Sequence, residues 1–91
     1  MEKQEEGGVQ IDLLIDRRDD VINLCEMKCT DNAFVIDKGY KDDLKKKMDV
    51  FIEEVHPKKA VHLTMITSNG IKHNEYSDIV QNEIAPETLF L

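Results

Sequence analysis

The stretch VQIDLLIDRRDDVINLCEMK, residues 9–28, contains two apolar runs on either side of a charged turn. From Val9 to Asp16 apolar and polar residues alternate, which is the period of a half-buried strand. From Val21 to Cys29 the chain is rich in Val, Ile and Leu, which is typical of a central strand covered on both faces. The stretch therefore predicts a β-hairpin with RRDD at its turn.

Three charged side chains interrupt these apolar runs: Asp12 in the first, and Glu26 and Lys28 in the second. An isolated charge in an apolar strand costs several kcal/mol unless it is paired, hydrated or bound to a metal ion. Glu26 and Lys28 share a face, since side chains two apart on a strand point the same way. In a hairpin centred on Asp19, Asp12 stands directly opposite Glu26 on that face. The sequence thus predicts a cluster of two carboxylates and one ammonium group.

Two facing carboxylates form a hard oxygen site of the kind that holds Mg²⁺ or Mn²⁺. Such an ion activates water and neutralises charge at a phosphodiester. We therefore expect Asp12 and Glu26 to be metal ligands and catalytic residues, and Lys28 to be a catalytic lysine that orients the attacking water or stabilises charge on phosphate oxygens. A cross-strand ion pair without catalysis accounts for the same three residues, and periodicity alone leaves both interpretations open.

An amphipathic helix is predicted for residues 38–55, where apolar residues recur at spacings of three and four. Asp37 is the expected N-cap, and Pro57 is expected to end the helix. The KKK sequence at residues 45–47 falls on the side away from the apolar stripe, so we expect these lysines to form a solvated helix face.

Two further strands are predicted downstream of the helix. Residues 60–67, AVHLTMIT, form an apolar strand, and a helix between two strands favours a parallel crossover. Residues 79–85 are expected to form a short edge strand. Pro86 is expected to open a final turn in which residues 89–91 dock on the core. Together these elements predict an α/β fold with a mixed sheet.

Length and charge limit the possible functions. The 91 residues suffice for one small domain, expected at residues 9–91 after a flexible lead-in at residues 1–8. The net charge of -7 argues against a general polyanion binder, so any contact with DNA has to be local, for example through Arg17 and Arg18 at the hairpin tip. Neither a membrane-spanning apolar run nor a secretory signal is apparent, and we expect a cytoplasmic protein.

Two sequence strings suggest a family. GGVQIDLLIDR followed by VINLCEMK resembles the PD-(D/E)xK phosphodiesterase superfamily, in which an Asp near one strand and an ExK on the next hold the catalytic metal. More closely, residues 7–91 resemble the C-terminal domain attached to bacterial AAA-type ATPases, through the strings QIDLLIDR, CEMK, LTMIT and NEIAPETLF. The resemblance implies a restriction-endonuclease-like core with Asp12 and Glu26 on Mg²⁺ or Mn²⁺ and Lys28 as catalytic lysine. Superfamily members generally have a helix and a strand before the Asp strand, so the expected core is N-terminally truncated.

Two functions follow from this resemblance and from the residues. The first is a Mg²⁺-dependent deoxyribonuclease domain that is part of, or derived from, a larger ATPase. The alternative is a catalytically silent oligomerisation or docking module with the same fold. In either case a single helix covers only one face of the predicted sheet, while the second strand is apolar on both faces, so we expect a homodimer.

Overall fold

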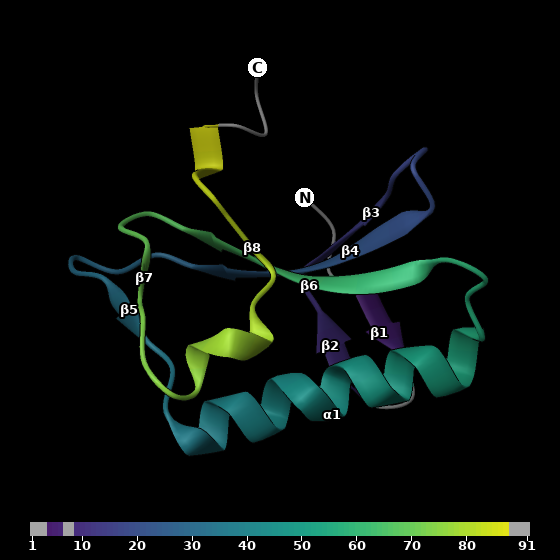
Figure 1. Ribbon diagram of the computed structural model, residues 1–91, viewed down its shortest axis with the longest axis horizontal. Helices are drawn as coiled ribbons and strands as arrows, with labels where there is room; N and C mark the ends of the chain where they lie inside the picture. The colour runs from purple at the N-terminus through teal and green to yellow at the C-terminus, as the bar shows by residue number, and fades with distance from the viewer. Residues whose placement is uncertain (1–3, 7–8, 88–91) are drawn as a thin grey trace.

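The computed structural model describes residues 4–6 and 9–87, and it confirms an α/β fold with a mixed sheet (Figure 1). The elements in chain order are β1 (Gln4–Glu6), β2 (Val9–Ile11), β3 (Leu13–Asp16), β4 (Val21–Lys28), β5 (Phe34–Val35), α1 (Lys38–Val55), β6 (Ala60–Thr67), β7 (Ile71–Lys72), the 3-10 helix η1 (Ser77–Ile79) and β8 (Asn82–Ile84).

The main sheet has the strand order β3-β4-β6-β8. β3 and β4 form the predicted antiparallel hairpin, in which Leu13 lies opposite Cys25. Asp20 closes the turn with a φ of 64°, a left-handed conformation that Asp adopts more readily than most residues. β4 and β6 are parallel along their full length, from Val21 beside Ala60 onward, so the predicted crossover is confirmed. β8 adds a further parallel strand at the edge.

Helix α1 begins and ends where the sequence predicts. The Asp37 carboxylate accepts a hydrogen bond from the backbone N–H of Tyr40 at 2.8 Å, which makes it the N-cap. His56 takes a left-handed conformation with a φ of 50°, and its N–H donates to the carbonyl of Ile52 at 2.9 Å, directly before Pro57. Within the described part of the chain, no helix has the length and apolar character needed to cross a membrane.

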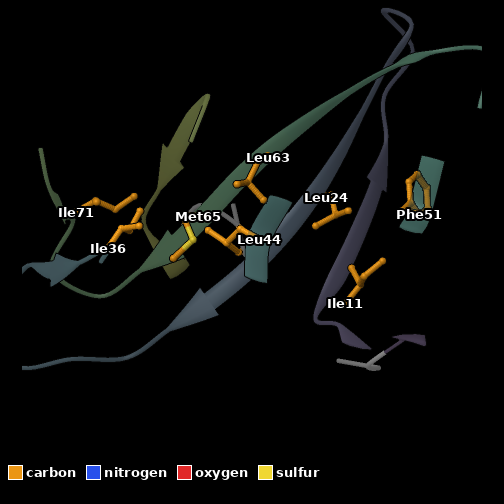
Figure 2. Packing of buried hydrophobic residues seen from close by; sticks show 8 residues of the cluster. All are labelled: Ile11, Leu24, Ile36, Leu44, Phe51, Leu63, Met65 and Ile71. Carbon is orange, nitrogen blue, oxygen red and sulfur yellow. The ribbon is translucent and has the colours of Figure 1, made fainter. Parts of the chain in front are cut away.

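The main core lies between α1 and one face of the sheet (Figure 2). Leu24 on β4 and Leu63 on β6 are neighbours in the parallel register, and both are fully buried on the face that α1 covers. Leu44 and Phe51 are the buried residues of the helix. Burial of such side chains contributes about 1.5–3 kcal/mol each, so this layer dominates the stability of the domain.

Among the described residues, the opposite face of the main sheet has no α-helix over it, and a 3-10 turn at residues 86–87 lies on this side (Figure 1). Three side chains on that face are nevertheless buried, those of Cys25, Thr64 and Ile66. Leu13 and Ile15 on β3 are only half-buried. The described chain after β8 leads away from the sheet on this side, opposite α1 (Figure 1). The sequence expectation that one helix covers only one face therefore agrees with the described structure.

Several elements differ from the sequence prediction. The predicted strand of residues 9–16 is interrupted by a bend at Asp12, and β2 pairs with β1 instead of β4. β1 itself lies within residues 1–8, for which no regular structure was expected. The edge strand expected at residues 79–85 is limited to β8, since η1 includes residue 79 and residues 80, 81 and 85 lie outside the strand. The predicted docking of residues 89–91 lies outside the described residues.

Candidate functional site

The hairpin brings the side chains of Asp12 and Glu26 close together. The β3–β4 ladder ends at the pair Leu13 and Cys25, and Asp12 and Glu26 lie one position beyond it, close enough for the charge of Asp12 to raise the pKa of Glu26. Asp12 lies in the bend between β2 and β3, and its Oδ2 accepts a hydrogen bond from the backbone N–H of Met27 at 3.0 Å. The side chain thus continues the hydrogen bonding of β4 where the backbone of β3 has ended. This contact fixes the Asp12 carboxylate beside Glu26.

Glu26 is a buried carboxylate on a central strand. Its side chain is 3% exposed, and the Nζ atom of Lys47 lies 2.7 Å from its Oε1 atom. Burial raises the pKa of Glu26, because it disfavours the charged form. The ammonium group of Lys47 opposes this shift, whereas the neighbouring charge of Asp12 adds to the rise in pKa. The two carboxylates and one lysine therefore form a coupled cluster between the sheet and α1.

Lys47 is a site residue that the sequence analysis missed. The KKK sequence was expected to be solvated throughout, and this holds for Lys45 and Lys46, which are exposed. For Lys47 the expectation is wrong, since its side chain is only 26% exposed. It lies about one helical turn after Leu44 and one before Phe51, the two buried residues of α1, so it faces the sheet.

Lys28 lies at the end of β4, two residues after Glu26 and on the same face. Its Nζ atom is 5.2 Å from the ring centroid of Tyr40 and 5.8 Å from that of Phe34. The two rings meet edge to face, with their centroids 5.1 Å apart. An ammonium group over aromatic faces is held by electrostatic attraction to the rings. The aromatic pair thus positions the predicted catalytic lysine without neutralising it.

Tyr40 is the second site residue that the sequence analysis missed. Its hydroxyl is buried and has no hydrogen-bond partner among the residues that the structure describes. Burial is the largest cause of a raised pKa of Tyr40, and the charges of Glu26 and Asp12 raise it further. The phenol is therefore close to the acidic pair. The available signal was the spacing of Tyr40, Leu44 and Lys47, which places all three on one side of a helix.

The cluster offers two carboxylate side chains, those of Asp12 and Glu26, as hard oxygen donors. Within residues 4–6 and 9–87 there is no group of three or more His, Cys, Asp or Glu side chains placed to hold a metal ion. Mg²⁺ is commonly bound by only one or two carboxylates, with water and substrate phosphate as the other ligands. The Asp12 and Glu26 carboxylates satisfy this requirement, and the Lys47 ammonium already occupies a cation position on Glu26.

The cysteines and the hairpin-tip charges lie apart from this cluster. Cys25 is buried, and burial raises its thiol pKa to about 11, while Cys29 is exposed; neither forms a disulfide. At the other end of the hairpin Arg17 pairs with Asp19, and Lys59 pairs with Asp16 at 2.6 Å. Both ion pairs are partly exposed, so each contributes little to stability, and the Arg17 charge is engaged within the turn.

Comparisons of the chain with protein-family profiles, with curated proteins and with solved structures find no match. Function is therefore inferred from the arrangement of Asp12, Glu26, Lys28 and Lys47.

Proposed function

We propose that this chain is a metal-dependent DNA phosphodiesterase, a nuclease domain of the PD-(D/E)xK type that belongs to or derives from a larger ATPase. The observation that carries the proposal is the neighbouring pair of carboxylates, Asp12 and Glu26, with Lys28 on the same face of β4 as Glu26. This arrangement combines a site for a hard divalent cation with a free ammonium group. It supports phosphodiester hydrolysis better than a reaction that needs a nucleophilic side chain.

Each residue has a defined task in this proposal. Asp12, held by the N–H of Met27, and the buried Glu26 would hold Mg²⁺ or Mn²⁺. The bound ion would supply Lewis acidity at the phosphate and lower the pKa of a water molecule. Lys28, kept in place by the rings of Phe34 and Tyr40, would offer positive charge to the phosphate oxygens.

DNA contact in this protein would be confined to the site. With a net charge of -7 the chain as a whole repels nucleic acid. Only a few phosphates would then be neutralised by Lys or Arg. Each contributes about -0.9 to the slope of log K against log salt, so the affinity for DNA should depend weakly on salt. A slope that corresponds to many phosphate contacts would contradict this picture of the interface.

The alternative function is a catalytically silent docking module with the same fold. One observation favours it: Glu26 is almost fully buried and is already paired with Lys47, as expected for a structural ion pair. The two functions differ in metal binding. If the carboxylates bind Mn²⁺, a concentration of 100 times the dissociation constant should stabilise the fold by about 2.7 kcal/mol. For a domain of this size that corresponds to a rise in melting temperature of about 10–20 °C.

The nuclease proposal is tested by cleavage of plasmid and single-stranded DNA in the presence of Mg²⁺ or Mn²⁺. We expect Asp12→Ala, Glu26→Ala and Lys28→Ala each to reduce cleavage by about a hundredfold or more, since the first two remove metal ligands and the third removes positive charge at the reacting phosphate. Asp42→Ala, which removes an exposed carboxylate from α1, is the matched control and should cleave normally. Equal cleavage by all three site variants would assign the activity to a contaminant or another site, and absence of both cleavage and metal stabilisation would favour the docking module.

A further inference from the structure

The contact between Lys47 and Glu26 has the geometry of an occupied cation site. The Nζ atom lies 2.7 Å from Oε1, which is a short charge-assisted hydrogen bond. The Glu26 side chain is 3% exposed, so its carboxylate has little access to water as a substitute partner. A buried carboxylate without a cation is costly, and Lys47 is the lysine that compensates it here.

We propose that Lys47 is the resident counter-ion of the acidic pair and that a divalent cation must displace it. This inference rests on the proposed function, because it concerns the same two carboxylates. An ammonium group and a metal ion compete for the oxygen lone pairs of Glu26, and their like charges repel each other at such short range. Lys47 therefore sets the concentration of metal ion at which the site fills.

The exposure of the two partners determines which one moves. Lys47 is 26% exposed and reaches the site from the helix, so its flexible stem can carry the ammonium group toward solvent. Glu26 is fixed on a central strand that pairs on both sides. Metal entry consequently moves Lys47 and leaves the strand in place.

Lys46 provides a matched control for this exchange. It is the preceding residue on the same helix and carries the same charge, but it is exposed. Lys46→Met thus removes one positive charge from the same part of the molecule without touching Glu26. Any difference between Lys47→Met and Lys46→Met then reports the contact itself and not the change in net charge.

The test is a titration of the full chain with Mn²⁺ alone, in which electron paramagnetic resonance measures the free ion. We expect Lys47→Met to lower the dissociation constant by about tenfold or more, which corresponds to 1.4 kcal/mol of relieved repulsion. Lys46→Met should stay within about twofold of the wild type, a difference well below that energy. Lys47→Gln retains a hydrogen-bond donor for Glu26 without the charge, and it replaces Lys47→Met if the latter does not fold.

The outcomes separate this inference from the proposed function. Displacement is supported if the Lys47 variants bind Mn²⁺ more tightly than the wild type and Lys46→Met does not. It is also supported if the Lys47 variants bind Mn²⁺ and the wild type does not. If the wild type binds Mn²⁺ and the Lys47 variants bind it equally or more weakly, displacement is wrong while the metal site stands. If the wild type and the Lys47 variants all fail to bind, both the inference and the metal site are overturned.

Discussion

In the metal-free protein, removing the charge of Lys47 and removing the charge of Glu26 should have very different effects on stability. Lys47→Met leaves a carboxylate that is 3% exposed without its cation. Glu26→Gln leaves an ammonium group on a side chain that is 26% exposed and can turn to water. Loss of the lysine should therefore be much more costly than loss of the carboxylate charge.

The magnitude follows from the burial of the remaining group. Breaking a buried ion pair by removing one partner costs about 3–5 kcal/mol. Because Lys47 is partly exposed, the cost of removing it should lie at the lower end of this range, and we expect Lys47→Met to lose about 3 kcal/mol of stability. In a domain of this size the melting temperature should fall by about 12–24 °C. For Glu26→Gln we expect a change of less than about 1 kcal/mol in either direction, because a neutral amide of the same shape replaces the charge.

The ionisation of Glu26 makes the stability of the fold depend on pH, and the direction of this dependence follows from its pKa. The pKa of Glu26 in the folded protein is raised above the ordinary value of 4.5, chiefly by burial. The folded state therefore binds this proton more tightly than the unfolded state does. The stability that protonated Glu26 contributes is fully present below its pKa in the unfolded chain. This stability is lost as the pH rises through the pKa of Glu26 in the folded protein. Glu26→Gln should remove this loss, and its stability should change less than that of the wild type between pH 4 and neutrality.

Urea denaturation in the presence of EDTA measures these free energies of unfolding. Lys46→Met, which removes the same charge from an exposed position, should stay within about 0.5 kcal/mol of the wild type. Equal stability of Lys47→Met and Lys46→Met would contradict this prediction, since it would mean that Glu26 does not need its cation. A loss for Glu26→Gln as large as that for Lys47→Met would refute the asymmetry.

Three further predictions concern the residues around this pair and the assembly of the domain. Tyr40→Phe removes a buried hydroxyl without a described partner and should stabilise the fold by about 1 kcal/mol in urea denaturation, whereas a loss would mean that the hydroxyl is hydrogen-bonded. Ellman's reagent at pH 8 should modify Cys29 quickly and Cys25 only after denaturation, because burial raises the pKa of the Cys25 thiol to about 11; rapid reaction of both thiols would contradict its burial. Sedimentation equilibrium at micromolar concentration should give the mass of a homodimer, in line with the half-buried apolar side chains on the sheet face away from α1, and a stable monomer mass would show that this face needs no second copy.

The hairpin and its register could be predicted from the sequence. The alternation of residues 9–16 and the polar turn fix which side chains share a face, and the observed ladder keeps this parity up to Leu13 and Cys25, one position before Asp12 and Glu26. The helix was equally predictable, because its caps at Asp37 and His56 coincide with the ends of the apolar pattern. Both features depend on local sequence, where propensity and periodicity act directly.

The position of Lys47 could not be predicted in the same way. The apolar stripe of α1 is broad, and the pattern does not say which part of it meets the sheet. Ile52 and Val55 belong to the stripe and are each 43% exposed, whereas Lys47 faces the sheet. The helix is oriented by the contacts of Leu44 and Phe51 and by the need of Glu26 for a cation, and these are tertiary interactions.

The parallel pairing of β4 with β6 has a consequence for the order of folding. The β3–β4 hairpin joins residues close in sequence, such as Asp16 and Ile22, and can form at low loop-closure cost. The β4–β6 ladder begins with Val21 and Ala60, which are far apart in sequence, so closing it costs more chain entropy. We therefore expect the two carboxylates to come together before Lys47 reaches them. Divalent ions or added salt should accelerate refolding at this early stage, even where they add little to the stability of the finished domain.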